Sequence, residues 1–218
     1  MIVVIQCAAR KAADAGHLRT QDGRNVMFVA NPDLAPPDDE RIYARPDDVA
    51  ETGTSWRTVL RQYNENPGDN RLGLLPAWRL YRNPTYEILA ERCGLDRLYI
   101  LSAGWGLIPA DFLTPNYDIT FSAAQNVQKF KRRRRHDSYR DFRMLLTNTS
   151  EPILFFGGKD YIRLFCRLTA DSAGQRTVFY AGSKPVAPGC RVQRFGKPYT
   201  NWHYQCAKAY VEEKIQLL

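Results

Sequence analysis

The sequence of 218 residues contains no long apolar run. A helix that crosses a membrane needs about 20 predominantly apolar residues. The apolar N-terminal segment MIVVIQCAAR ends within ten residues and has no basic stretch before it. We therefore expect no signal peptide and no membrane partner. We interpret the β-branched run from Ile2 to Cys7 as a buried central strand.

Cysteine and histidine are scarce and scattered. The five cysteines are odd in number and show no CxxC spacing, which argues against a disulfide framework and against a zinc site. The histidines His17, His136 and His203 form no HxxxH or HExxH pair, so we do not expect a metal hydrolase. We expect no metal and no other cofactor, and the unpaired thiols favour a reducing cytoplasm.

Positive charge is in excess. Thirty-one Lys and Arg residues against 23 Asp and Glu residues give a net charge of +8, and part of the excess lies in the segment 129–136, KFKRRRRH, here called the basic segment. A charge run is often only a solvated surface, but Lys and Arg that neutralise phosphates bind nucleic acid of any sequence. We expect a DNA partner, with RNA as the alternative, whose backbone contacts Lys129, Lys131, Arg132, Arg133, Arg134, Arg135 and Lys159.

Apolar runs and helical patterns alternate along the chain. Hydrophobic residues make up 44% of it, enough for one core. We predict a single-domain α/β fold with a mostly parallel or mixed central sheet and helices on its faces. The predicted strands are 2–7, 98–102, 153–156, 178–181 and 192–195. The predicted helices are 55–63, a short turn and a helix within 76–93 that are divided by Pro84, 160–168 and 201–215.

The segment 12–73 is polar and rich in Pro, Gly and Asp. Only residues 55–63 have a helical pattern, and PDLAPPDDE and ETGTSW are typical of irregular backbone. We interpret this segment as a long irregular insertion after the first strand.

Chemically reactive residues follow the predicted strands, and ligands of open α/β sheets bind beyond the carboxyl ends of strands. The first strand is followed by Cys7, Arg10 and Lys11, which could hold a phosphate or carboxylate. The alternative is that this is an ordinary loop after a strand, with solvated Arg and Lys side chains. The third is followed by Gly157, Gly158 and Lys159, before a helix whose N-terminus could hold an anion.

Two further segments carry candidate groups. After the second strand, Ser102 precedes Trp105, which offers either a stacking face for a base or a core side chain. Tyr117 and Asp118 follow, and Asp118 could act as general base, stabilise a sugar cation, or merely cap a turn. In the segment 197–204, Asn201 and His203 lie among aromatic residues that suit base stacking, although a helix N-cap explains part of this pattern.

Three stretches, IQCAARK, AWRLYRNPTYEILAERCG and LYILSAGWGLIPADFLTPNYDITF, resemble the YaaA-like family. The matching motifs are Leu80-Tyr81-Arg82-Asn83-Pro84, Leu101-Ser102-Ala103, Gly106-Leu107 and Tyr117-Asp118-Ile119-Thr120. Asn116 interrupts the family's Pro-Tyr-Asp motif, and no helix-hairpin-helix signature is present. The resemblance implies an α/β core linked to nucleic acid, to DNA damage or oxidative stress and, through archaeosine synthase, to chemistry on modified bases.

Together these features favour a DNA glycosylase, a hydrolase that cleaves the N-glycosidic bond of a damaged or modified base. Arg132 to Arg135 would grip the backbone, Trp105 or Tyr117 would stack the base, and Asp118 would stabilise the sugar cation. The pocket would be lined by Cys7, Arg10, Lys11, Ser102, Asn201 and His203. The alternatives are a non-catalytic DNA-binding stress protein and an RNA base-exchange or base-modifying enzyme.

Overall fold

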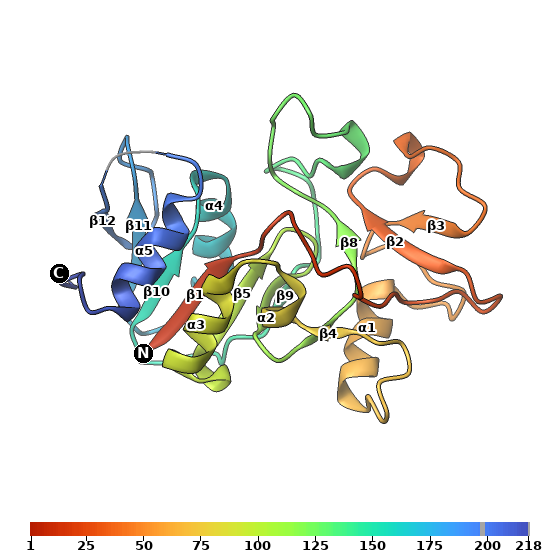
Figure 1. The fold of residues 1–218 in the computed structure, drawn as a ribbon, viewed down its shortest axis with the longest axis horizontal. Coiled ribbons are helices and arrows are strands. Elements are labelled where there is room, and N and C mark those ends of the chain that lie inside the picture. Colours follow the sequence, from red (N-terminus) through yellow and green to blue (C-terminus); the bar gives the residue numbers. More distant parts are fainter. Residues whose placement is uncertain (197–198, 218) are drawn as a thin grey trace.

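The apolar N-terminal run forms β1 (Ile2–Gln6), the central strand of a seven-stranded sheet in a computed structural model that describes residues 1–196 and 199–217 (Figure 1). Within these residues the strand order is β12-β11-β10-β1-β5-β6-β9. All neighbouring strands are parallel except β5 and β6, which are antiparallel. The other strands are β5 (Leu98–Ser102), β6 (Gly106–Pro109), β9 (Phe142–Arg143), β10 (Ile153–Phe156), β11 (Arg176–Tyr180) and β12 (Arg191–Arg194).

This strand order creates a topological switch point. The chain moves from β1 to β5 on one side and later returns to β10 on the other side of β1. The five parallel strands from β12 to β5 thus have the order of a doubly wound sheet, in which ligands bind beyond the carboxyl ends of the strands at the switch. The predicted α/β fold with a mixed central sheet is confirmed.

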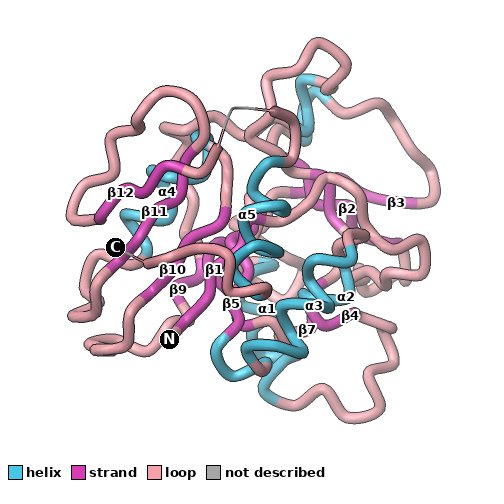
Figure 2. Tube along the Cα trace, turned by 60° about the vertical axis from the view of Figure 1, so that its left-hand side comes forward, coloured by secondary structure: helices cyan, strands magenta, loops and turns pink. Residues whose placement is uncertain are grey.

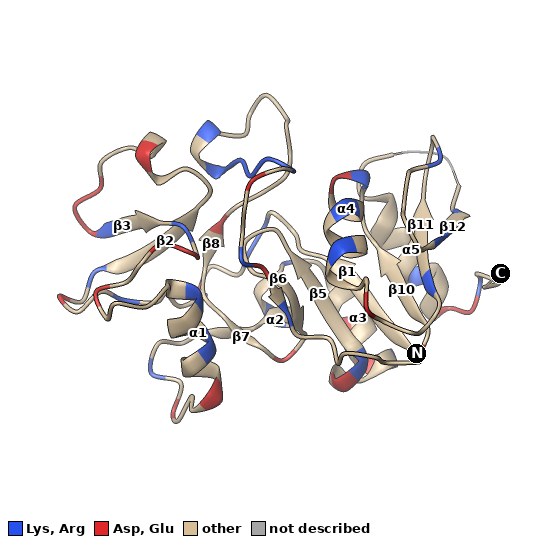
Figure 3. Ribbon diagram, turned by 180° about the vertical axis from the view of Figure 1, so that it is seen from behind, with Lys and Arg blue, Asp and Glu red and all other residues tan. Residues whose placement is uncertain are grey.

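Helices cover both faces of the sheet. On one face α3 (Pro84–Cys93) packs against α5 (Trp202–Val211), and α4 (Lys159–Leu168) covers the other (Figures 1 and 3). The predicted division at Pro84 is confirmed: α2 (Ala77–Leu80) precedes α3, and Asn83 Oδ1 accepts a hydrogen bond from Thr85 N at 3.0 Å. The last helix ends at Val211, four residues before the predicted boundary.

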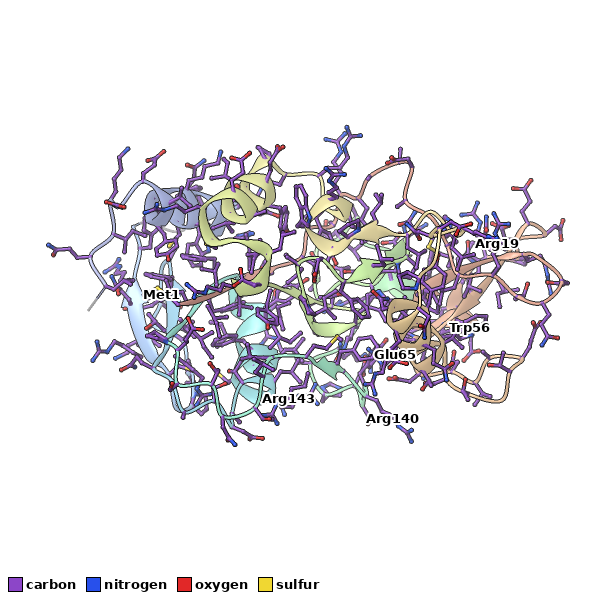
Figure 4. The ribbon with its side chains drawn as sticks, turned by 90° about the horizontal axis from the view of Figure 1, so that it is seen from below. Met1, Arg19, Trp56, Glu65, Arg140 and Arg143 are labelled. Carbon is purple, nitrogen blue, oxygen red and sulfur yellow. The ribbon has the colours of Figure 1, made fainter. Side chains whose placement is uncertain are left out.

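The insertion 12–73 is mostly loop, as its composition predicts, but it also forms strands (Figure 2). It contains β2 (Asn25–Val29), β3 (Arg41–Ala44), the predicted helix as α1 (Trp56–Glu65) and a 3₁₀ turn, η1 (Pro32–Leu34). β2 pairs in parallel with β3 and with β8 (Tyr117–Asp118). In Figure 4 Met1 lies in one half of the molecule and Trp56 in the other, so the insertion lies toward one end of the molecule's length.

The insertion and the sheet contribute side chains to the same hydrophobic core. Its Phe28 ring lies 4.9 Å from the Trp105 ring and 6.0 Å from the Trp56 ring, measured between centroids, and all three side chains are buried. The remaining short elements are β4 (Leu75–Pro76), β7 (Leu113–Thr114), η2 (Leu95–Arg97) and η3 (Lys129–Lys131). In the part of the chain that the structure describes, no helix is both long and apolar enough to cross a membrane.

Candidate functional site

A cavity of about 970 Å³ opens beyond the carboxyl ends of β1, β10 and β11. We call it the sheet-edge cavity. Its walls come from the segments that leave these strands and from the first turns of α4 and α5, and they include Gln6, Cys7, Thr120, Ser122, Gly158, Lys159, Asp160, Tyr161, Tyr180, Gly182, Ser183, Asn201, Trp202, His203 and Tyr204. It occupies the switch point between β1 and β10, where doubly wound sheets bind their ligands.

The N-terminus of α4 faces this cavity. Gly158 is the N-cap residue and has no side chain to cap the helix, while its own N–H donates to Gln6 Oε1 at 2.6 Å. Lys159 is exposed beside it. The first turn of a helix carries partial positive charge, so this wall favours an anionic group. The predicted role of Lys159 as a cation near an anion agrees with this position, although it lies at the cavity and not in the basic segment.

Aromatic hydroxyl groups gather at the wall nearest β1, where Tyr161 and Tyr204 line the cavity and Tyr86 is buried behind them. Tyr86 donates from its hydroxyl to Gln6 O at 2.7 Å, and its oxygen lies 3.3 Å from the hydroxyl of Tyr204. The hydroxyl of Tyr161 lies 3.2 Å from Cys7 Sγ, which also accepts from Ala103 N at 3.4 Å. Burial raises the pKa of Tyr86, Tyr161 and Tyr204, so these phenols are neutral hydrogen-bonding groups.

Behind this wall lies a buried hydroxyl chain. The Tyr117 hydroxyl is 2.8 Å from the Tyr81 hydroxyl and 2.8 Å from Ser102 Oγ. Ser102 Oγ also accepts from Gly104 N at 3.2 Å and from Trp105 N at 3.1 Å. Burial raises the pKa of Tyr117 well above its ordinary value. The predicted direct contacts of Tyr117 and Ser102 with substrate are wrong, because both side chains are almost fully buried.

A polar cluster of Lys11, Asp118 and Lys131 lies above Tyr117. Lys11 Nζ is 4.2 Å from the centroid of the Tyr117 ring and donates to Ala9 O at 3.4 Å. Burial lowers the pKa of Lys11, and the nearby ammonium of Lys131 adds to the lowering. Ala9 and Thr120 both line the sheet-edge cavity, so the cluster borders its rim.

Asp118 differs from its predicted environment. The sequence predicts a carboxylate held among apolar neighbours, but its side chain is 41% exposed and its Oδ2 lies 2.6 Å from Lys131 Nζ. β8 is only two residues long and leaves Tyr117 facing the core, so the next side chain faces outward. The carboxylate is therefore paired with an ammonium group and accessible from solvent.

The basic segment divides into surface and interior cations. Arg133 is 3% exposed and forms a bidentate pair with Asp141 at 2.7 and 2.8 Å, so its predicted contact with nucleic acid is wrong. Lys131 pairs with Asp118, and Arg135 pairs with Asp160. The exposed side chains of Lys129, Arg132 and Arg134 have no ion pair with any described residue. Figure 3 shows cationic residues along this loop between β8 and β9.

Trp105 belongs to the core. It is fully buried against Phe28 and stacks on Phe142, with 6.4 Å between the ring centroids, so the prediction that it stacks a base is wrong. Two buried arginines donate hydrogen bonds to the backbone carbonyl groups of residues 103–105, in the turn that follows β5. Arg57 donates to Trp105 O at 2.8 Å and to Gly104 O at 3.1 Å, and Arg133 donates to Ala103 O at 2.7 Å.

The start of α5 supplies two predicted residues to the cavity. Asn201 is the N-cap residue in the left-handed region, with φ 63°, but its side chain does not cap the helix. His203 is 5% exposed, and burial lowers its pKa to about 4. Its Nε2 atom has no hydrogen-bond partner among the described residues. The preceding Lys197 and Pro198 lie outside the described residues.

Some residues were predicted to line the pocket but do not, and others line a cavity but were not predicted. Arg10 is exposed and does not line the sheet-edge cavity; its carbonyl accepts from Arg82 N at 3.0 Å. Arg163, on the exposed face of α4, lines a smaller cavity of about 230 Å³ with Arg135 and His136. Arg163 was not predicted as a site residue because it lies within an ordinary amphipathic helix. Nor were Gln6, Tyr180 and Tyr204, whose roles depend on distant segments that meet at the sheet edge.

Neither the metal-binding types of side chain nor the comparisons with known proteins identify a known site. In residues 1–196 and 199–217, no group of three or more His, Cys, Asp or Glu side chains could hold a metal ion. No protein-family model, curated protein or solved structure significantly matches the chain. The resemblance to the YaaA-like family stays a prediction from its motifs.

Proposed function

We propose that the chain is a nucleic-acid-acting enzyme of the YaaA-like kind that binds one base in the sheet-edge cavity. The reaction that fits best is the one favoured by the sequence: a DNA glycosylase cleaves the N-glycosidic bond of a damaged or modified base. The observation that carries the proposal is the position of this cavity next to the basic segment, to which it is joined by the ion pair between Arg135 and Asp160.

The size and lining of the cavity suit a base. Its volume of about 970 Å³ is at the upper end of the range for small-ligand sites, which is about 300–1,000 Å³. The rings of Trp202 and Tyr204 offer surfaces for stacking, and the unpartnered Nε2 of His203 offers one hydrogen bond. A base-binding enzyme must supply stacking and edge contacts of this kind once a base leaves the duplex.

Phosphates would bind outside the cavity. Arg132 and Arg134 are exposed and have no carboxylate partner among the described residues, so phosphate binding breaks no ion pair of theirs. The N-terminus of α4 and Lys159 would hold a phosphate closer to the base. Together these groups would position one nucleotide at the rim.

The rim supplies a carboxylate for the reaction. Cleavage of an N-glycosidic bond builds positive charge on the sugar ring, and an ionised carboxylate stabilises that charge or orients the attacking water. The Asp118 carboxylate is accessible from solvent, and it follows Tyr117, whose ring contacts the ammonium of Lys11. We therefore assign Asp118 the catalytic role and Tyr117 the role of positioning Lys11 through a cation–π contact.

The experiment incubates the protein with DNA duplexes and single strands that carry modified purines or pyrimidines, followed by alkaline cleavage at abasic sites. The wild-type protein should produce strand breaks at one class of modified base. Asp118→Asn should reduce product at least 100-fold while DNA affinity changes less than threefold. Asp69→Asn, an exposed carboxylate on the insertion, is the matched control and should keep full activity.

Other results would overturn the proposal. Tight DNA binding with no abasic product on any panel would indicate the non-catalytic binding protein. Exchange of a labelled free base into RNA, with no abasic product, would indicate the base-exchange enzyme. Full activity in Asp118→Asn would remove the carboxylate from the mechanism.

A further inference from the structure

Two thiols that are far apart in the sequence face each other across the edge of the sheet. Cys166 lies on α4 and is buried, and Cys190 ends the loop between β11 and β12 and is half-buried. Their sulfur atoms are 3.7 Å apart, close to van der Waals contact. A disulfide bond is about 2.05 Å long, so the two sulfur atoms would need to approach each other by roughly 1.7 Å to form the bond.

We propose that Cys166 and Cys190 are a redox modification site, which peroxide oxidises to an intramolecular disulfide that ties the β11–β12 loop to α4. The proposal stands on this pair of residues and does not depend on what the sheet-edge cavity binds. No other two thiols in residues 1–196 and 199–217 make such a contact.

The surroundings of the pair assign different roles to the two thiols. A hydrogen bond from the Cys166 thiol, together with the guanidinium of Arg176, lowers the pKa of Cys190 to about 7, although partial burial acts in the opposite direction. Arg176 is fixed beside the pair, because its Nη1 donates to Cys166 O at 3.2 Å and to Thr169 Oγ1 at 3.4 Å. The pKa of Cys166 is raised by the same hydrogen bond and by burial. Cys190 is therefore the thiolate that solvent can reach, and Cys166 is the resolving thiol.

The chemistry balances with a peroxide as the oxidant. The Cys190 thiolate attacks one peroxide oxygen and the O–O bond breaks, which leaves a sulfenic acid on Cys190 and releases hydroxide, or an alcohol from an organic peroxide. The Cys166 sulfur then attacks the Cys190 sulfur and displaces the hydroxyl group as water, which takes up the proton of Cys166. The two thiols lose two electrons, and these electrons reduce the O–O bond.

The disulfide would act on the sheet-edge cavity. The β11–β12 loop contributes Gly182, Ser183 and Pro185 to its wall, and the first turn of α4 contributes Lys159 to the same cavity. In the reduced protein the end of this loop is held by a turn in which Cys190 N donates to Ala187 O at 3.1 Å. A covalent bond between Cys190 and Cys166 would tie the end of this loop to the last turn of α4 and reduce the freedom of the loop.

The test counts free thiols in the full-length protein before and after treatment with hydrogen peroxide. Of five thiols, two should disappear and return after dithiothreitol. Peptide mass spectrometry without reduction should find one linked pair, containing positions 166 and 190, that is two hydrogens lighter than the separate peptides. Hydrogen exchange at residues 182–190 should slow several-fold in the oxidised protein.

Matched variants separate the pair from general oxidation. Cys190→Ser and Cys166→Ser should each abolish the linked peptide, whereas Cys93→Ser, at another half-buried cysteine, should leave it unchanged. The proposal is overturned if peroxide converts Cys190 to sulfinic acid with no linkage, if all five thiols survive, or if the linkage involves another cysteine. Unchanged hydrogen exchange in the linked protein would overturn the effect on the loop.

Discussion

Arg133 and Asp141 form a bidentate ion pair in the interior of the protein, with side chains that are 3% and 0% exposed. The guanidinium also lies 3.7 Å from the centroid of the Tyr139 ring and donates to Ala103 O at 2.7 Å. Arg133 thus connects the basic segment to the turn that follows β5. A residue in the middle of the most basic stretch of the sequence has a structural role.

The first prediction concerns the stability of this pair. Arg133→Ala leaves the Asp141 carboxylate buried with only Arg167 as a partner, and breaking a buried ion pair costs about 3–5 kcal/mol. Urea denaturation followed by tryptophan fluorescence should show a much lower midpoint. The neighbouring Arg134→Ala removes an exposed side chain, so its free energy of unfolding should change by less than about 0.5 kcal/mol. Equal midpoints for the two variants would contradict the assignment.

The second prediction concerns the exposed cations. If Arg132 and Arg134 each contact one phosphate, replacing either with alanine should weaken DNA binding similarly for all sequences. Each replacement should also reduce the slope of log K against log salt by about 1. Fluorescence anisotropy with a labelled oligonucleotide at several salt concentrations measures both effects. Arg71→Ala, an exposed arginine on the insertion, is the control. A slope that stays the same in Arg132→Ala and Arg134→Ala would exclude phosphate contacts at these positions.

Three central strands of the sheet, β1, β5 and β10, were predictable because their sequences are nearly continuous apolar runs. β5 and β10 have the predicted bounds, and β1 ends one residue earlier than predicted. β6 was missed because its four residues follow a glycine-rich turn and lack a strand pattern of their own. It forms because Gly106, with φ 93°, lets the chain reverse and pair with β5.

The site was less predictable because side-chain direction depends on long-range pairing. The basic segment runs beside Thr120, whose carbonyl accepts from Arg133 N at 2.9 Å. This pairing directs Arg133 inward and leaves Arg132 and Arg134 outside. Trp105 is covered by Phe28, from an insertion that composition describes as irregular. No local pattern contains either contact, whereas His203 was found because it lies in a dense aromatic segment.

The third prediction concerns the amine of Lys11. Burial lowers its pKa, and the Asp118 carboxylate opposes the lowering. Competitive acetylation over a range of pH, quantified by mass spectrometry, should give a midpoint for Lys11 below the ordinary lysine value of about 10.4. Asp118→Asn should move the midpoint lower still, and Lys131→Met should move it higher, because Lys131 contributes to the lowering. A midpoint at the ordinary value in the wild-type protein would contradict the lowering of the Lys11 pKa by its half-buried position.

The fourth prediction concerns pH and His203. Burial lowers its pKa from 6.5 to about 4, so protonation is harder in the folded state than in the unfolded state. Above pH 6.5 the imidazole is neutral in both states, so His203 causes no loss in the free energy of unfolding. As the pH falls from 6.5 toward 4, the unfolded state takes up a proton that the folded state does not, and the protein loses stability. At pH 4.5 the loss from this residue is about 2 kcal/mol.

Urea denaturation at pH 7 and at pH 4.5 tests this sign, and His203→Gln removes the titrating group. Carboxylates that lose their partners on acidification affect both proteins equally, so the informative quantity is the difference between them. The wild-type protein should lose about 2 kcal/mol more than His203→Gln over this range. His136→Gln, at an exposed histidine, should follow the wild-type profile. Parallel losses in wild type and His203→Gln would mean that the imidazole has the same pKa in the folded and unfolded states. That result would contradict the lowering of its pKa by burial at the wall of the sheet-edge cavity.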